Sequence, residues 1–186
     1  MKRIAVFASG SGTNAENLIR HFRTSDKGEV VLVLCNKPGA GVIDRAGRLS
    51  VPVHLFDRTQ FSETGEVLQV LQEARIDFLV LAGFLWLVPG ELVEAYPGRI
   101  VNIHPALLPA YGGKGMYGQR VHEAVLAAGE KESGITIHHV NAKYDEGDVI
   151  FQARCPVEAG DTPDVLAARV HALEYAHFPG VVEKLL

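Results

Sequence analysis

The sequence predicts an α/β fold in which helices doubly wind one mostly parallel sheet, with antiparallel strands and a terminal helix at the C-terminal end. Through most of the 186-residue chain, apolar runs of strand length alternate with stretches of helical periodicity. These runs are nearly continuous, which is typical of strands buried on both faces of a parallel sheet. After residue 133 the order changes, because two strand-like segments follow each other with no helix between them.

The expected elements alternate along the chain as a parallel sheet requires. Strands are expected at residues 4–8, 30–35, 51–56, 78–82 and 100–103, and then at 133–141 and 148–157. Helices are expected at residues 13–22, 41–49, 64–74 and 89–96, and finally from 161 or 162 to 185. Pro89 and the pair Thr162-Pro163 occupy positions that favour helix starts. No repeat or linker interrupts the pattern, so we expect residues 1–186 to form a single domain.

Composition narrows the class of protein. Apolar residues make up 47% and charged residues 22% of the chain, which is ordinary for a soluble globular protein. The formal net charge of −4 provides no basic excess for nucleic acid or an anionic membrane. The N-terminal apolar run is too short for an export signal, and no segment approaches a membrane span. Cys35 and Cys155 lack C-x-x-C spacing, so we expect reduced thiols in a cytoplasmic protein.

The loop after the first strand, ASGSGTNAENL, has the composition of a phosphate-binding turn. Gly10 and Gly12 permit a tight turn, and the free amides that open the next helix favour an anion. The letters G-x-G-x-x-A also satisfy the dinucleotide fingerprint, but LCNKPGAG after the second strand lacks the acid that binds ribose. A phosphate monoester held by Gly12, Thr13 and Asn14 therefore fits better than NAD. The alternative is a turn that merely needs glycine.

The fifth strand ends in VNIHPALLPAYGG, at the sheet edge where ligands bind in open parallel sheets. Asn102 and His104 are two positions apart, so their side chains point to the same face. Asn102 can donate an amide N–H to a developing oxyanion, and protonated His104 can donate and later release a proton. Pro105 disfavours a helical conformation at His104. The alternative is a histidine with a purely structural role.

The segment HHVNAKYDEGDVI joins the last two strands and holds Asp145, Glu146 and Asp148. A carboxylate near His104 would hold the imidazole in its charged form by Coulomb attraction. The alternative is a polar turn whose acids face water. The eight histidines offer no spaced pair with a third ligand, so no metal is expected.

Four segments together resemble the phosphoribosylglycinamide formyltransferases (GAR transformylases), a family of folate-dependent formyltransferases. They are SGSGTN near the start, LAGFLWLV at 81–88, NIHPALLPAY at 102–111 and YDEGDVI at 144–150. The resemblance spans almost the whole chain and implies a Rossmann-like formyltransferase fold. It implies transfer of the formyl group of 10-formyltetrahydrofolate to the amine of glycinamide ribonucleotide in purine biosynthesis. We expect these small-molecule substrates, no metal, no nucleic-acid or membrane partner, and a monomer or weak homodimer.

The resemblance also implies roles for individual positions. The catalytic positions are Asn102, His104 and Asp145. The substrate-binding positions are Gly12, Thr13, Asn14, Gly83, Phe84, Leu85 and Glu174. The folate-binding positions are Arg58, Leu85, Trp86, Leu87, Val88, Asn102 and Val140. The turn from residue 140 to 145 closes over the pterin ring.

In the mechanism that the resemblance implies, the glycinamide amine attacks the formyl carbon directly. Asn102 and the imidazolium of His104 stabilise the oxyanion that develops. Asp145 keeps His104 protonated and positions a water that relays the proton of the amine.

Three features depart from the common pattern of the family. GGKGMYGQRVHEAV, after residue 111, is glycine-rich and about five residues longer than usual. Trp86 stands where a basic residue is common, and Ala106 replaces a serine.

Two other folate-dependent activities are the nearest alternatives. A methionyl-tRNA formyltransferase is expected to carry a further C-terminal domain and a basic surface. A formyltetrahydrofolate hydrolase is expected to carry an N-terminal regulatory domain. A non-catalytic nucleotide-binding module would explain the first loop, but not Asn102, His104 and Asp145.

Overall fold

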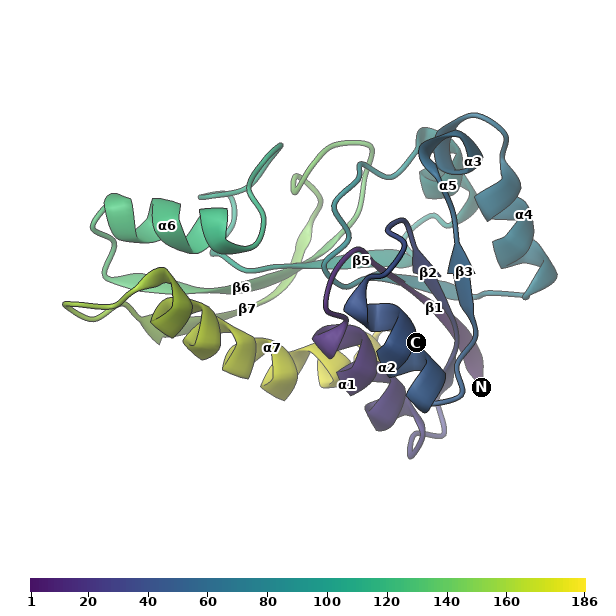
Figure 1. Cartoon of the computed structure of the whole chain (residues 1–186), viewed down its shortest axis with the longest axis horizontal. Helices are drawn as coiled ribbons and strands as arrows, with labels where there is room; N and C mark the ends of the chain where they lie inside the picture. The colour runs from purple at the N-terminus through teal and green to yellow at the C-terminus, as the bar shows by residue number, and fades with distance from the viewer.

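A computed structural model describes residues 1–186 and contains a seven-stranded sheet with the strand order β3-β2-β1-β4-β5-β6-β7 (Figure 1). The strands are β1 (Lys2–Ala8), β2 (Gly28–Cys35), β3 (Val53–Leu55), β4 (Phe78–Leu81), β5 (Ile100–His104), β6 (Glu132–His139) and β7 (Val149–Pro156). The first five pair in parallel, whereas β6 pairs antiparallel with both β5 and β7. The predicted fold class is therefore confirmed.

Seven helices connect the strands. They are α1 (Thr13–Phe22), α2 (Gly41–Arg48), α3 (Arg58–Ser62), α4 (Glu66–Glu73), α5 (Gly90–Ala95), α6 (Gln119–Ala127) and α7 (Pro163–Lys184). Two of them, α3 and α6, are absent from the sequence prediction. The sequence does contain a motif that could have predicted the start of α3, because Asp57 and Gln60 form a reciprocal capping box. None of the helices is long and apolar enough to cross a membrane.

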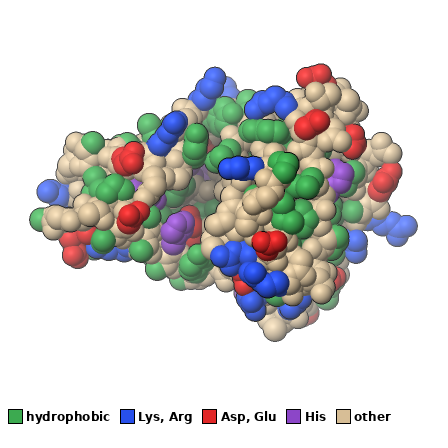
Figure 2. Space-filling model, in the orientation of Figure 1, with side chains coloured by type: hydrophobic (Ala, Val, Ile, Leu, Met, Phe, Trp, Pro, Cys, Tyr) green, Lys and Arg blue, Asp and Glu red, His purple; other side chains and the backbone are tan.

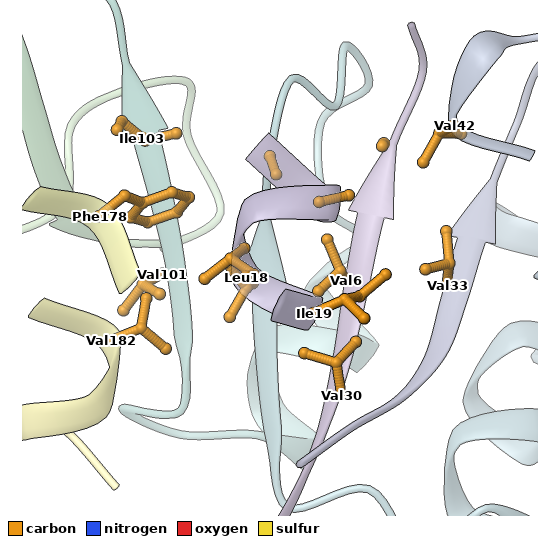
Figure 3. Packing of buried hydrophobic residues seen from close by; sticks show 14 of the residues in the cluster. Val6, Leu18, Ile19, Val30, Val33, Val42, Val101, Ile103, Phe178 and Val182 are labelled. Atoms are coloured by element: carbon orange, nitrogen blue, oxygen red, sulfur yellow. The ribbon is translucent and has the colours of Figure 1, made fainter. Parts of the chain in front are cut away.

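Helices cover both faces of the sheet because neighbouring strand residues point in opposite directions. Along β1, Ile4 and Val6 belong to one core cluster, whereas Ala5 and Phe7 belong to the other. The first cluster contains side chains of α1, α2, α6 and α7, and the second contains side chains of α3, α4 and α5. Figure 3 shows Ile19 of α1 beside Val6 of β1 in the first cluster. The doubly wound arrangement follows from this alternation.

The long helix α7 continues through Pro179, which cannot donate a backbone hydrogen bond to the carbonyl of Tyr175 one turn earlier. The side-chain amide of Asn17 in α1 donates to that carbonyl at 3.1 Å. Phe178 is fully buried beside the proline in the first core cluster. This contact joins α1 to α7 close to the part of α7 that reaches the cavity described below.

Strand order reverses between β1 and β4, since β2 lies on one side of β1 and β4 on the other. Ser9, just after β1, bridges this point in two ways. Its backbone N–H donates to the carbonyl of Gly83 at 3.0 Å, and its Oγ accepts from the N–H of Leu85 at 3.2 Å. In open α/β sheets the crevice at such a switch point is the usual ligand site.

Candidate active site

A cavity of about 890 Å³ lies at the carboxyl ends of β1, β4 and β5. Figure 2 shows a hollow in the middle of this face with Lys and Arg side chains at its rim. Every site residue predicted above lines the cavity except Arg58. Residues far apart in the sequence are thus brought to one place by the parallel topology.

The phosphate-binding loop has a backbone that only glycine adopts easily. Gly12 has φ of 77° and caps α1 without any side-chain hydrogen bond. A Cβ added to Gly12 would lie 2.5 Å from the Cα of Val42, whereas a Cβ added to Gly10 would meet nothing within 4 Å. The first amides of α1, beginning at Thr13, therefore have no capping side chain and lie beside the cavity. Such a helix start favours an anion.

A buried carboxylate lies beside this loop. Glu174 of α7 is 4% exposed and accepts from the Nδ2 of Asn14 at 2.8 Å. His171, one helical turn away, is also 2.8 Å from Glu174, and this contact raises the pKa of His171. The Oδ1 of Asn14 is buried and has no hydrogen-bond partner. This end of the cavity thus presents a carboxylate, an imidazole whose pKa is raised, and an unused acceptor.

Asn102 and His104 occupy the end of β5 and share one face, as the strand period predicts. His104 is 4% exposed. Its Nε2 is 2.7 Å from the carbonyl oxygen of Tyr111, which can only accept, so this nitrogen carries a proton. Its Nδ1 is therefore the nitrogen that is free to gain or lose a proton.

The structure brings Asp145 to this pair from the turn between β6 and β7. Asp145 Oδ2 is 3.6 Å from His104 Nδ1, and Asp145 Oδ1 is 3.4 Å from Asn102 Nδ2. The backbone N–H of Gly113 donates to Asp145 Oδ2 at 2.9 Å. Burial raises the pKa of Asp145, but the neighbouring His138 and His104 side chains and the N–H of Gly113 outweigh burial and hold this pKa below its ordinary value. Asp145 is therefore a carboxylate at neutral pH.

The pKa of His104 is shifted in the direction opposite to the one that attraction by Asp145 alone would produce. Burial lowers the pKa of His104 and outweighs both the charge of Asp145 and the bond to Tyr111. The desolvation cost of a buried cation exceeds the attraction of one carboxylate at 3.6 Å.

Residues 83–88 and the turn at 140–145 form the opposite side of the cavity. The hydroxyl of Tyr144 accepts from the backbone N–H of Leu87 at 3.1 Å, which ties the turn to this segment. Leu85 and Leu87 are exposed, and Val88 is buried. Phe84 belongs to an aromatic cluster with Trp86, their ring centroids 6.2 Å apart. The segment thus presents apolar side chains and backbone groups to the cavity.

Arg58 does not reach the cavity lining. Its guanidinium lies 4.5 Å from the centroid of the Trp86 ring, in a cation–π contact. Trp86 itself lines the cavity and packs against Phe56 and Phe61. The basic side chain therefore contacts one predicted folate-binding residue, Trp86, without lining the cavity itself.

Several cavity residues have no place in the sequence prediction of the site. They are the histidines His122, His138 and His171, the lysines Lys37, Lys114 and Lys143, and Tyr144. The glycine-rich segment is a cavity wall at Gly113–Gly118, and α6 begins directly after it. The sequence could have indicated His171, because helical spacing places it on the same face of α7 as the predicted site residue Glu174. Nothing in the sequence indicates His138, because the register between β5 and β6 cannot be seen in it. The structure holds no group of three His, Cys, Asp or Glu side chains that could bind a metal ion.

The profile of the formyl transferase family matches residues 2–182, and the chain belongs to this family. One relative is the chloroplastic phosphoribosylglycinamide formyltransferase of Arabidopsis thaliana, 44% identical over 97% of this chain. The chain spans 64% of the length of that plant protein. The phosphoribosylglycinamide formyltransferase of Bacillus subtilis (strain 168) is 34% identical, and the match covers 100% of this chain and 95% of the Bacillus protein.

A solved structure supports the same relationship. The crystal structure of phosphoribosylglycinamide formyltransferase from Bacillus halodurans superposes with a TM-score of 0.90 at 41% sequence identity. The match covers 100% of this chain and 95% of that one. The resemblance predicted from the four sequence segments is confirmed.

Proposed function

We propose that this chain transfers the formyl group of 10-formyltetrahydrofolate to the amine of glycinamide ribonucleotide in purine biosynthesis. The observation that carries the proposal is the meeting of Asn102, His104 and Asp145 inside one cavity. The same cavity is lined by the start of α1 and by residues 83–88. The family and the names of its relatives support the assignment.

The α1 end of the cavity fits a phosphorylated ribose. The uncapped amides from Thr13 onward suit a phosphate, and the half-exposed imidazole of His171 adds positive charge beside them. The unpartnered Oδ1 of Asn14 is an acceptor for a hydroxyl or amine proton of the substrate. Glycinamide ribonucleotide has a phosphate, ribose hydroxyls and an amine, which are the three kinds of group that these residues suit.

The other end fits a flat heterocycle. Backbone groups of residues 85–88 can pair with ring nitrogens, while Leu85 and Leu87 offer apolar surface. The 140–145 turn, anchored by Tyr144, closes this end. The bound folate supplies the formyl group, and the protein positions it against the amine.

In the proposed reaction, Asn102, His104 and Asp145 have different roles. Asn102 donates an amide N–H to the formyl oxygen, which becomes negative as the amine nitrogen bonds to the formyl carbon. Neutral His104 takes the proton that the amine loses on its free Nδ1, and Asp145 stabilises the imidazolium. His104 returns that proton to the folate nitrogen as its bond to the formyl carbon breaks. One proton thus passes from amine to folate, directly or through a water beside Asp145.

The test mixes purified protein with 10-formyltetrahydrofolate, with and without glycinamide ribonucleotide, and follows the deformylated folate spectroscopically. We expect release that depends on the ribonucleotide. Release in its absence indicates a hydrolase. Binding of folate with no release in either tube indicates a non-catalytic module and refutes the proposal.

The organisation of the protein is part of the proposal. We infer that residues 1–186 act as a single domain, as a monomer or weak homodimer, in the cytoplasm. Continuity of the one sheet supports the single domain, and the free, buried thiols of Cys35 and Cys155 support a reducing compartment. One cooperative unfolding transition and sedimentation of the native protein would test the first two statements.

A further inference from the structure

His138 is a buried histidine that the proposed reaction does not use. It lies on β6 directly opposite Asn102 of β5 in the antiparallel register, and it is 2% exposed. Its Nε2 is 3.1 Å from Asn102 Nδ2 and 3.5 Å from Asp145 Oδ1. Its ring therefore contacts two of the three catalytic side chains.

The backbone determines which nitrogen of His138 carries the proton. Its Nδ1 is 2.9 Å from the carbonyl oxygen of His139, and a carbonyl oxygen can only accept. Nδ1 must therefore be the donor. In the neutral ring, Nε2 then has a lone pair and accepts a hydrogen bond from Asn102. With both nitrogens engaged, His138 has no proton to contribute to the reaction.

The lone pair on Nε2 of His138 determines the orientation of the Asn102 amide. If the amide were flipped, Oδ1 would face the lone pair of His138 and the carboxylate of Asp145 with no donor among the three groups. In the observed orientation Nδ2 donates one N–H to His138 at 3.1 Å. The second N–H makes only a long contact, 3.4 Å, with Asp145 Oδ1. That second N–H is the one available to a substrate oxygen.

We propose that His138 is a positioning residue, whose Nε2 holds the Asn102 amide with an N–H rather than its carbonyl toward the formyl oxygen. The inference rests on the proposed function and deepens it. A flipped amide would present a carbonyl oxygen to a developing negative charge and would lose the stabilisation that the donor provides. Holding one orientation before the substrate binds avoids a reorganisation cost during the reaction.

Two substitutions separate this role from simple packing. Gln places an acceptor near the position of Nε2, whereas Asn reaches only the position of Nδ1. We expect His138→Gln to retain kcat within about threefold. We expect His138→Asn to lose kcat by about 10-fold to 100-fold, less than the roughly 10²–10³ typical of removing an oxyanion donor outright. KM for the ribonucleotide should change little in either variant, because the phosphate end of the cavity is untouched.

The neighbouring histidine provides a matched control. His139 points to the opposite face of β6, so His139→Asn should leave kcat unchanged. In an Asn102→Ala background, His138→Asn should have no further effect, because the side chain it orients is gone. Equal losses in the Gln and Asn variants, or an additive loss in the double variant, would overturn the positioning role.

A readout independent of turnover completes the test. Nitrogen-15 NMR of the imidazole rings in the unliganded native protein should show His138 as the Nδ1–H tautomer, with Nε2 accepting a hydrogen bond. The Nε2–H tautomer would overturn the inference even in an active enzyme. If instead the tautomer is as expected but no ribonucleotide-dependent release occurs, the proposed function fails while the orientation of Asn102 stands.

Discussion

His104 Nδ1 lies 3.6 Å from Asp145 Oδ2, while the other nitrogen of the same ring donates to the carbonyl oxygen of Tyr111 at 2.7 Å. One nitrogen is thus tied to the backbone, and the other faces a carboxylate across a gap too long for a direct hydrogen bond. Burial lowers the pKa of the ring, whereas Asp145 favours its charged form. In the reaction proposed above, His104 is therefore first a base and then, after accepting a proton, an acid.

The pH dependence of kcat/KM, which reports the pKa values of the unliganded protein, should reveal this balance. The pKa of His104 is lowered, so the acid limb of the profile should lie below pH about 6.5, the ordinary value for histidine. Asp145→Asn removes the charge that opposes burial, so the limb should move to still lower pH while the plateau value of kcat/KM falls. Rates measured from pH 4.5 to 8 in both proteins check this. A limb that moves to higher pH in the variant would contradict the assignment.

Removing the imidazole should abolish most turnover without unfolding the protein. His104→Ala is expected to lower kcat by roughly 10²–10⁴, the contribution typical of a general acid–base group. The surrounding strand residues Val101 and Ile103 retain their buried contacts, so the far-UV spectrum and ribonucleotide binding should persist. Steady-state rates and calorimetric binding provide the comparison. A variant with native turnover would remove His104 from the mechanism.

The ion pair between His171 and Glu174 should make stability depend on pH. Glu174 raises the pKa of His171 above its unfolded value, so the charged ring binds its proton more tightly in the folded protein. The stabilisation is fully present below pH about 6.5 and is lost as pH rises through the higher folded pKa. His171→Gln should therefore lower the Tm more at pH 6 than at pH 9. An equal difference at both values would exclude the pair as a source of stability.

Gly12 and Gly10 form a matched pair for a stability test. Gly12→Ala must accept φ of 77° and a 2.5 Å contact with Val42, so we expect a loss of about 2 kcal/mol or more. Gly10→Ala meets nothing within 4 Å and should change the unfolding free energy by less than about 1 kcal/mol. Urea unfolding measures both. Similar losses in the two variants would show that steric demand at Gly12 is not what selects glycine.

The contact of Asn17 with the carbonyl of Tyr175 should matter only because Pro179 cannot donate to that carbonyl. Asn17→Ala is expected to destabilise the protein by about 1 kcal/mol. In a Pro179→Ala background the helix supplies its own donor, and the same substitution should cost less. A double-mutant cycle in urea measures the difference. Equal costs in the two backgrounds would refute the compensation.

The geometry of the candidate site could be predicted where it is local in the sequence. Asn102 and His104 share a face because the strand period is two, which requires no knowledge of the fold. The start of α1 follows a glycine turn that the letters display directly. Asp145 came from resemblance to a family, and the structure places it beside both catalytic side chains. Nothing in the local sequence indicates that Asp145 lies close to His104, because the two positions are 41 residues apart in the chain.

The sequence does not indicate the placements that long-range packing decides. Arg58 carries the charge expected near a folate tail, yet its guanidinium lies on the ring of Trp86 outside the cavity lining. The helix α6 follows a glycine-rich segment that weakens any local helical signal, and its buried Val121 and Val125 find their partners only in the assembled core. These placements depend on what surrounds a residue rather than on its neighbours in sequence.

The sequence by itself determined the order of the strands and of five of the seven helices, the face shared by Asn102 and His104, the glycine turn before α1, and the family. Each follows from local periodicity, local backbone preference or a quoted motif. Only the tertiary structure decided that β6 runs antiparallel beside β5 with His138 opposite Asn102. Only the tertiary structure decided that burial outweighs Asp145 and lowers the pKa of His104. Strand register and desolvation are properties of the assembled core, and the electrostatics of the site depend on both.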